Sequence, residues 1–208
     1  WIFSRLNNLI ATTDKLWDDF QISEIHREIH DFIWFEFCDW YIELAKIRIR
    51  NKDKDVVNIL AYVLESSLRL LHPMMPFITE ESWQLLMARL PKDNNRKNSI
   101  MISSYPEHHE SFINKGAESE LTTVIEVITN IRNIRAQLKI PLGEKLDTLI
   151  TGAGSQKLTA DHGQSIERLA NITLLSNKTK PGSPSSDSVQ FIAGHMKLAV
   201  NIGQSTDL

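Results

Sequence analysis

The stretch 23–50 constrains the fold most, because neither glycine nor proline interrupts it. At about 3.6 residues per turn, its apolar side chains cover two adjacent faces instead of one stripe. The two faces consist of Ile33, Phe37, Trp40, Leu44 and Ile47, and of Trp34, Cys38, Tyr41 and Ala45. A helix that is apolar nearly all round has neighbours on most sides. The sequence therefore predicts a central helix that starts after an N-cap at Ser23 and ends near Arg50.

One narrow polar line remains on this expected helix. Its members alternate three and four residues apart, and they are Glu36, Asp39, Glu43, Lys46 and Arg50. Apolar residues border the line at Phe35, Ile42 and Ile49. A partner that reaches the line could therefore touch polar and apolar groups together. We expect the line to face either water or a ligand.

Helical periodicity recurs outside the central stretch. Apolar residues at helical spacing predict further helices at 1–20, 55–71, 76–90 and 118–138. Proline at position 76 suits the first position of the fourth helix, and the connections between the first four helices are short. The expected fold is therefore mainly α, with residues 1–140 forming an antiparallel helical bundle.

The pattern changes after Pro141, and a small mixed α/β module is expected over residues 141–208. Short apolar runs predict strands at 146–151, 172–175, 189–193 and 196–202, with a short helical stretch at 166–171. Residues 178–188 have the composition of a flexible loop. Gly194 and His195 between two of the strands suit a type II′ hairpin.

Composition sets limits on function. The formal net charge of −3 gives no overall basic signal, so any RNA contact must be a local patch. The single cysteine, Cys38, excludes an internal disulfide, and its apolar surroundings predict a buried thiol in a reducing cytoplasm. No run approaches about 18 apolar residues, and no signal peptide is recognisable. Because the chain opens at Trp1 inside a helical pattern, we expect it to be part of a longer protein.

Motifs that carry catalysis do not occur in the sequence. It contains no P-loop, dinucleotide-binding glycine pattern, serine nucleophile elbow or paired-cysteine zinc motif. His26 and His30 are four residues apart, as helical metal ligands can be, but no convincing third ligand accompanies them. We therefore expect no catalytic residue, no cofactor-binding residue and no metal site in these residues.

Two groups of cations fit an RNA contact better. Lys46 and Arg50 lie among basic residues at the end of the central helix, and Arg132 and Arg135 share a face near Lys139. Such cations can neutralise phosphates, but they can equally cap helix ends and solvate a surface. Both interpretations remain open from spacing alone.

The polar line makes a sharper hypothesis. A carboxylate at Glu43 can accept a hydrogen bond from the exocyclic amine of cytosine, while Ile42 offers an apolar contact to an unstacked base. The competing interpretation is a solvated stripe in which Glu43 pairs with Lys46 along the helix.

Three blocks of the sequence resemble the anticodon-binding helical domain of valyl-tRNA synthetases. They are residues 37–46 (FCDWYIELAK), 70–83 (LLHPMMPFITEESW) and 131–136 (IRNIRA) followed by Ile140-Pro141, and residues 1–6 (WIFSRL) look like the start of that domain. The blocks are in family order and spacing, and the resemblance covers about the first 150 residues. Isoleucyl and leucyl relatives share the architecture, but the FCDWY run favours the valyl branch.

The resemblance implies a part of a class I synthetase that uses ATP to attach valine to its tRNA. In the family, the pair after Trp-Tyr faces the last anticodon base, a cytosine in valine tRNAs, and this pair corresponds to Ile42 and Glu43. ATP would bind in a catalytic domain upstream, and the family's base-stacking aromatic also lies upstream. A coiled-coil arm would begin near Leu208. The partners implied are the anticodon stem-loop of a valine tRNA and the rest of the synthetase chain, with no membrane.

Two alternatives to this interpretation stay open. The chain could be a helical protein-interaction module without a role in RNA binding. It could also be the equivalent domain of an isoleucyl or leucyl relative.

Overall fold

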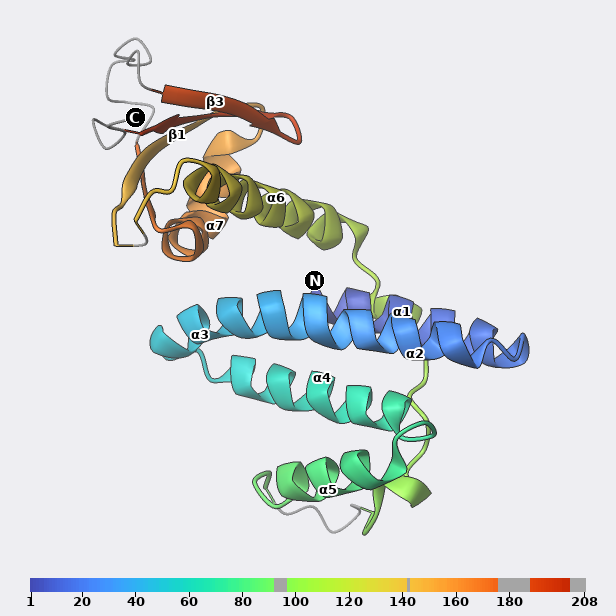
Figure 1. Cartoon of the computed structure of the whole chain (residues 1–208). Coiled ribbons are helices and arrows are strands. Elements are labelled where there is room, and N and C mark those ends of the chain that lie inside the picture. The colour runs from blue at the N-terminus through green and yellow to red at the C-terminus, as the bar shows by residue number, and fades with distance from the viewer. Residues whose placement is uncertain (92–96, 142, 176–187, 203–208) are drawn as a thin grey trace. The chain divides into compact units, whose positions relative to one another are not determined.

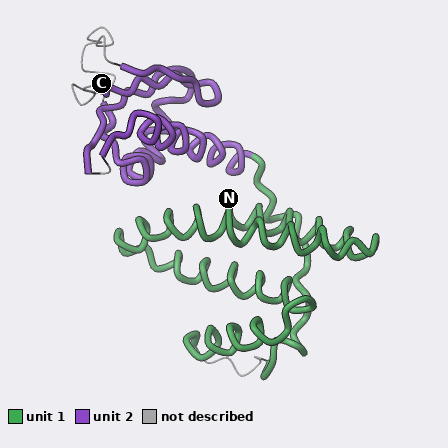
Figure 2. Tube along the Cα trace, viewed as in Figure 1, with its two compact units in different colours: residues 1–115 green, residues 116–208 purple. Residues whose placement is uncertain are grey.

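A computed structural model describes residues 1–91, 97–141, 143–175 and 188–202. The chain forms two compact units, unit 1 from Trp1 to Lys115 and unit 2 from Gly116 to Leu208 (Figure 2). We expected a boundary near residue 140. The helix before that position instead belongs to unit 2, because its side chains bond to other elements of that unit.

Unit 1 is a bundle of long helices joined by short turns (Figure 1). Its elements are α1 (Ile2–Asp18), α2 (Ile22–Asp31), η1 (Phe32–Tyr41), α3 (Ile42–Arg50), α4 (Asp55–Leu71), α5 (Pro76–Met87) and two 3₁₀ turns at Ile100–Ile102 and Glu110–Phe112. The expected helices in this part of the chain are confirmed. The first helix of the central stretch starts after Gln21, whose side chain makes no capping bond, so the expected cap at Ser23 is wrong.

The central helix is continuous, but its middle third is π-helical. Phe32 and Ile42, which border η1, both have right-handed helical backbone angles, and Figure 1 shows one unbroken coil from α2 to α3. A π-helix bonds each N–H to a carbonyl five residues back, so its turns are wider than α turns. The buried side chains follow that wider turn, since they are Phe32, Phe37 and Tyr41.

This change of period corrects the expected faces. Trp34 is 58% exposed and Phe35 is 52% exposed, so the apolar side chains of the central helix are not buried on all sides. Cys38 is exposed rather than buried, and partial desolvation together with the Asp39 carboxylate raises the pKa of its thiol. The buried positions of the central helix instead pack against α1 and α4 in one core.

Specific side-chain bonds fix α1 against its neighbours. The Arg5 guanidinium donates to both carboxylate oxygens of Glu36, at 2.6 and 2.7 Å. The Trp17 indole N–H donates to the Tyr105 hydroxyl at 3.1 Å. The bonds of Arg5 link α1 to η1, and the bond of Trp17 links α1 to the segment that follows α5.

Unit 2 combines two helices with a four-stranded sheet. Its elements are α6 (Lys115–Gln137), β1 (Leu146–Gly152), α7 (Ser155–Ala170), β2 (Ile172–Leu174), β3 (Ser188–Ala193) and β4 (Met196–Asn201). The strand order is β2-β1-β4-β3, with β1 and β2 parallel and the other pairs antiparallel. The four expected strands are confirmed, and α7 provides the crossover that the parallel pair requires.

Two local features of unit 2 follow from its sequence. Helix α7 is far longer than the stretch expected at 166–171, and it contains Gly163, which a leucine side chain of β2 approaches closely. Gly194 has a φ of 55° in the β3–β4 connection, as the first central position of a type II′ turn requires. The loop expected at 178–188 lies almost wholly outside the described residues. Within the described part of the chain, no helix is long and apolar enough to cross a membrane.

Candidate nucleic-acid interface

The structure divides the expected polar line into two parts. Glu36 faces α1 and forms the two-bond ion pair with Arg5, with only 24% of its side-chain area exposed. The π-helical turns between Glu36 and Glu43 separate the two carboxylates. Asp39 lies near the end of η1, and Glu43, Lys46 and Arg50 lie in α3, where Glu43 and Lys46 form an ion pair.

Glu43 lies in the first turn of α3 and is open to solvent. Its side chain is 41% exposed, and its Oε1 accepts a hydrogen bond from Lys46 Nζ at 2.5 Å. The Lys46 side chain is itself 54% exposed. Both side chains of this pair are therefore accessible to solvent.

The apolar neighbour Ile42 is partly buried against the core of unit 1. It offers less surface than the sequence suggested, whereas Ile49 on the next turns is 45% exposed. The Ile42 and Glu43 pair, with Lys46 and Arg50, is called the α3 surface below.

The end of α3 carries an excess of exposed cations. Arg48 donates to Asp53 Oδ2 at 2.9 and 2.7 Å, and this hydrogen bond holds the pKa of the Asp53 carboxyl below its usual range. Arg50, Lys52 and Lys54 are all exposed. The end of α3 and the turn after it therefore present positive charge to the solvent.

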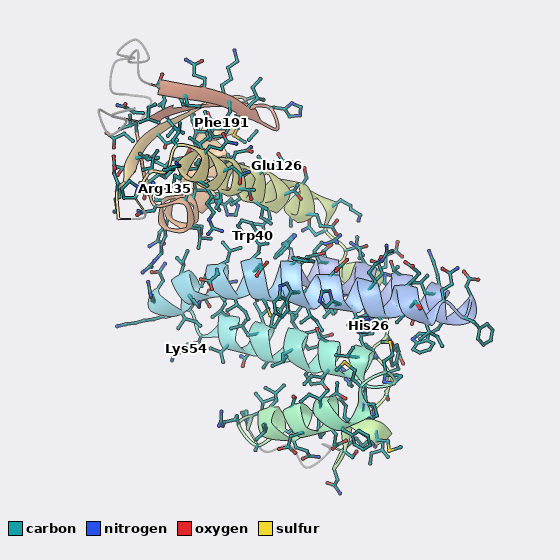
Figure 3. The ribbon with its side chains drawn as sticks, in the orientation of Figure 1. His26, Trp40, Lys54, Glu126, Arg135 and Phe191 are labelled. Atoms are coloured by element: carbon teal, nitrogen blue, oxygen red, sulfur yellow. The ribbon has the colours of Figure 1, made fainter. Side chains whose placement is uncertain are left out.

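The expected pair Arg132 and Arg135 divides in the same way. Arg132 is exposed, and its Nε donates to the Leu169 carbonyl at 3.0 Å. Arg135, labelled in Figure 3, is only 5% exposed and donates to three backbone carbonyls. The acceptors are Asn171 at 3.2 Å, Pro141 at 2.8 Å and Glu144 at 2.6 Å. The expectation that Arg135 contacts RNA is not supported, because its guanidinium is occupied inside unit 2.

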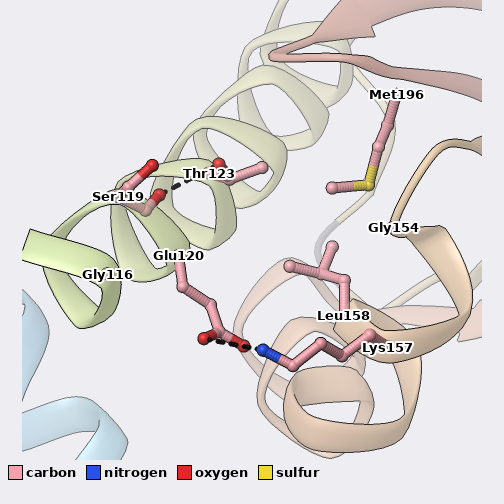
Figure 4. A pocket seen from close by; sticks show the side chains of 8 residues that line it. All are labelled: Gly116, Ser119, Glu120, Thr123, Gly154, Lys157, Leu158 and Met196. Carbon is pink, nitrogen blue, oxygen red and sulfur yellow. Dashed lines mark hydrogen bonds and ion pairs between the residues drawn. The ribbon is translucent and has the colours of Figure 1, made fainter.

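A cavity of about 360 Å³ in unit 2 lies between α6 and α7 (Figure 4). Lys157 Nζ donates to Glu120 Oε2 at 3.3 Å at its edge, and this hydrogen bond lowers the pKa of the Glu120 carboxyl. His162 lies 3.3 Å from the other Glu120 oxygen. Because the charges pair with one another, this cavity does not favour a ligand of either sign.

His26 and His30 form part of an exposed aromatic row. Their ring centroids are 6.4 Å apart, and the His30 ring lies 6.1 Å from the Trp34 ring at an interplanar angle of 6°. Among the described residues, no group of three or more His, Cys, Asp or Glu side chains is arranged to hold a metal ion.

Sequence reasoning missed two features of the central helix. The exposed row through Trp34 was missed because a 3.6-residue period places Trp34 on an apolar face. The Tyr41 hydroxyl is buried without a hydrogen-bond partner, directly before Ile42. No local sequence signal marks an orphan hydroxyl, because its neighbours come from distant segments.

Comparison with known proteins shows which protein family this chain resembles. A family model described as the anticodon-binding domain of tRNA ligase matches residues 1–150. The valine–tRNA ligase of Lactobacillus johnsonii is 41% identical over 154 residues, which is 72% of this chain and 17% of that protein. The valine–tRNA ligases of Fervidobacterium nodosum and Dehalococcoides mccartyi strain CBDB1 are 35% and 34% identical over the whole chain, covering 23% and 24% of those proteins. The chain thus spans about a fifth of the length of these relatives.

Proposed function

The chain belongs to the anticodon-binding domain family of tRNA ligases, and we propose from that premise that its α3 surface reads the last anticodon base of a valine tRNA. The valine branch is favoured over an isoleucyl or leucyl relative by the names of the similar proteins. The role is to recognise and position tRNA in the cytoplasm, within a longer ligase that joins valine to its tRNA at the expense of ATP. No catalytic residue and no cofactor site is assigned to this chain.

The observation that carries the proposal is the open carboxylate of Glu43. Glutamate accepts a hydrogen bond from cytosine N4, which uracil cannot supply because it carries a carbonyl there. Single-stranded loops are recognised through such edges of unstacked bases. Ile42 contributes the apolar part of the contact with the surface that it leaves exposed.

The ion pair between Glu43 and Lys46 does not prevent Glu43 from binding cytosine. Exposed pairs of this kind contribute about 0–1 kcal/mol, so a base amine can replace the ammonium at small cost. Lys46 is then free to turn toward a phosphate, and Arg50 lies one turn further along the same surface. Arg132 remains a proposed phosphate contact from unit 2, whereas Arg135 does not.

The test uses the full chain and two anticodon stem-loops that differ only in cytosine or uracil at the last anticodon position. Glu43→Ala should lower the discrimination between them by about 1–3 kcal/mol. Glu81→Ala, which removes an exposed carboxylate from α5, is the matched control. Equal discrimination in the wild type and in Glu43→Ala would refute the assignment.

A second candidate function, a protein-interaction module, is favoured by one observation. Apolar side chains are exposed on α5 and the following 3₁₀ turn, with Phe77 at 91%, Met101 at 79% and Ile102 at 62%. RNA binding through cations weakens steeply with salt, whereas an apolar protein contact does not. Absent or salt-insensitive binding of the stem-loops would favour this second function.

A further inference from the structure

We infer that the turn between α1 and α2 docks into an apolar pocket with a cationic rim, in the part of the ligase that lies outside residues 1–208. We call this turn the α1 tip and define it by Asp18, Asp19, Phe20 and Ile22. It forms one end of unit 1 (Figure 1). The inference rests on the proposed function only in taking this chain as part of a longer ligase.

The α1 tip exposes apolar side chains that unit 1 does not bury. Phe20 is 87% exposed and Ile22 is 54% exposed. Phe20 also has a φ of 56°, in the left-handed region that favours glycine. This conformation closes α1, because the Phe20 N–H donates to the Trp17 carbonyl at 3.1 Å. A bulky side chain is disfavoured at such a position, and here its ring gains almost no burial in return.

The same type of cap ends α3 and α6, but with a polar residue at the left-handed position. Lys52 after α3 has a φ of 62°, and Lys139 after α6 has a φ of 52°. Their N–H groups bond the carbonyls three residues back, as the Phe20 N–H does. Both lysines are exposed, so their charged ends are hydrated. Phe20 gains neither hydration of a charge nor burial within unit 1, and its ring is therefore suited to a contact with a partner.

The charges of the α1 tip indicate the chemistry of that partner. Asp18 is the last residue of α1, Asp19 is its C-cap, and both are exposed. Carboxylates are unfavourable at the negative end of a helix dipole, and Lys15 is the basic residue of that last turn. Burial and the Asp18 carboxylate raise the pKa of Asp14, and His108 only partly opposes this effect. Negative charge thus dominates at the tip, so a cationic pocket rim complements it, whereas RNA phosphates would be repelled.

The size of the α1 tip favours a pocket in the same polypeptide. A phenylalanine buries about 150–250 Å², whereas a stable complex of separate proteins buries about 1,200–2,000 Å². The tip is therefore too small to hold a second copy or another protein by itself. A pocket in the same polypeptide is present at a roughly millimolar effective concentration, so one aromatic anchor is sufficient. The relatives have such additional chain, since this chain covers only 17%, 23% and 24% of their lengths.

The first experiment replaces Phe20 by p-benzoylphenylalanine, a photo-crosslinking residue, in the full-length ligase that contains this chain. Irradiation without tRNA should join position 20 to a peptide of the same polypeptide, outside residues 1–208, in which apolar residues accompany Arg or Lys. The matched control carries the crosslinking residue in place of Lys52, which is also exposed and left-handed.

Three outcomes of the crosslinking would overturn the inference. The first is a yield at position 20 no higher than at position 52. The second is crosslinks confined to residues 1–208. The third is crosslinks to a second ligase molecule or, after tRNA is added, to the tRNA.

The second experiment separates docking from folding. In this chain alone, Phe20→Gly should leave the denaturation midpoint of unit 1 unchanged or raise it, because glycine suits a φ of 56° and the lost ring is exposed. In the full-length ligase, the same variant should speed amide hydrogen exchange at residues 21–25 by about tenfold or more, because docking no longer protects the turn. Lys52→Gly is the matched control and should leave that exchange unchanged. A lower midpoint in this chain, or unchanged exchange in the full-length variant, would refute docking through Phe20.

The cationic rim is tested by combining Asp18→Asn with Asp19→Asn in the full-length ligase. This double variant should speed the exchange at residues 21–25 by about threefold, because the tip loses its charge complementarity. Raising the salt concentration should speed exchange in the wild type more than in the double variant. Asp161→Asn removes an exposed carboxylate from α7 and is the control. Equal exchange in the wild type and the double variant would overturn the charge complementarity on which the inference depends.

This inference and the proposed function fail separately. Phe20→Gly should leave the discrimination between cytosine and uracil unchanged, and Glu43→Ala should leave the crosslink from position 20 unchanged. Absence of that crosslink would overturn docking of the α1 tip even if Glu43 discriminates cytosine. A specific crosslink would support docking even if Glu43→Ala discriminates as well as the wild type.

Discussion

The helix ends at α3 and α6 carry similar cationic sequences but use them differently. At the end of α3, Arg50 and Lys52 are exposed, and Glu43 and Lys46 form a pair in the solvent. At the end of α6, Arg135 is buried and satisfies three carbonyls of its own unit. The difference arises after the helix, because α3 ends in a charged turn, whereas the chain after α6 folds back over it.

The comparison teaches that cation spacing does not by itself identify a binding surface. A cation near a helix C-terminus is attracted both by its own carbonyls and by a passing phosphate. Which of the two it binds depends on whether the following chain supplies further acceptors within reach.

The largest effect is expected from Arg135→Ala. Its loss leaves three carbonyl groups without their donor, so the free energy of unfolding of unit 2 should fall by about 3 kcal/mol. All five tryptophans lie in unit 1. Denaturation followed by far-UV circular dichroism should therefore show an earlier transition, while the tryptophan fluorescence transition stays unchanged.

Arg135→Lys is the control for this prediction, because it keeps the charge but not the three-way fork. It should recover part of the lost stability. An Arg135→Ala protein as stable as the wild type would mean that the guanidinium is dispensable inside unit 2, and the contrast with α3 would disappear.

A smaller difference is expected between the coupling free energies of the two ion pairs of the central helix. The Arg5–Glu36 pair is two-bonded and partly buried, so a double-mutant cycle should give a coupling free energy of about 1 kcal/mol. The exposed Glu43–Lys46 pair should give about 0.3–0.5 kcal/mol or less. Chemical denaturation monitored by tryptophan fluorescence measures both cycles. Stronger coupling at Glu43–Lys46 would make that pair part of the scaffold and weaken its assignment as an RNA reader.

The smallest effect is expected from Tyr41→Phe. Arg135 is a buried polar group that donates to three backbone carbonyls, whereas the Tyr41 hydroxyl is buried without a hydrogen-bond partner. Removing an unsatisfied hydroxyl should leave stability unchanged or raise it by up to about 1 kcal/mol. A loss of 1 kcal/mol or more in the denaturation midpoint analysis would reveal a bound water or another partner for this hydroxyl.

Local periodicity was sufficient for much of the fold. The helices of unit 1 and the four strands of unit 2 follow directly from apolar spacing and turn residues. Helix α7 was underestimated because its first half is largely polar and Gly163 follows directly after that half. The assignment of α6 to unit 2 depends on contacts with α7 and its following turn, such as those of Arg132 and Arg135, which spacing along one helix cannot show.

The candidate site was predictable where it depends on one helix turn, and not where it depends on distant chain segments. The exposure of Glu43 and its pairing with Lys46 follow from i,i+3 spacing. The burial of Arg135 depends on carbonyls up to 36 residues away. The exposure of Trp34 depends on the π-helical turns, and an almost uniformly apolar run gives no indication of such turns.

Those wide turns have a consequence for anyone who wishes to move the α3 surface into another protein. In an α-helix, a single residue corresponds to a rotation of about 100° around the axis. Rebuilding Phe32–Tyr41 at its full length as a regular α-helix would therefore turn Glu43 away from its present direction, because each residue of a π-helix turns the chain by a smaller angle. A graft onto an idealised straight helix would keep every residue of the motif, but the Glu43 side chain would point in a different direction.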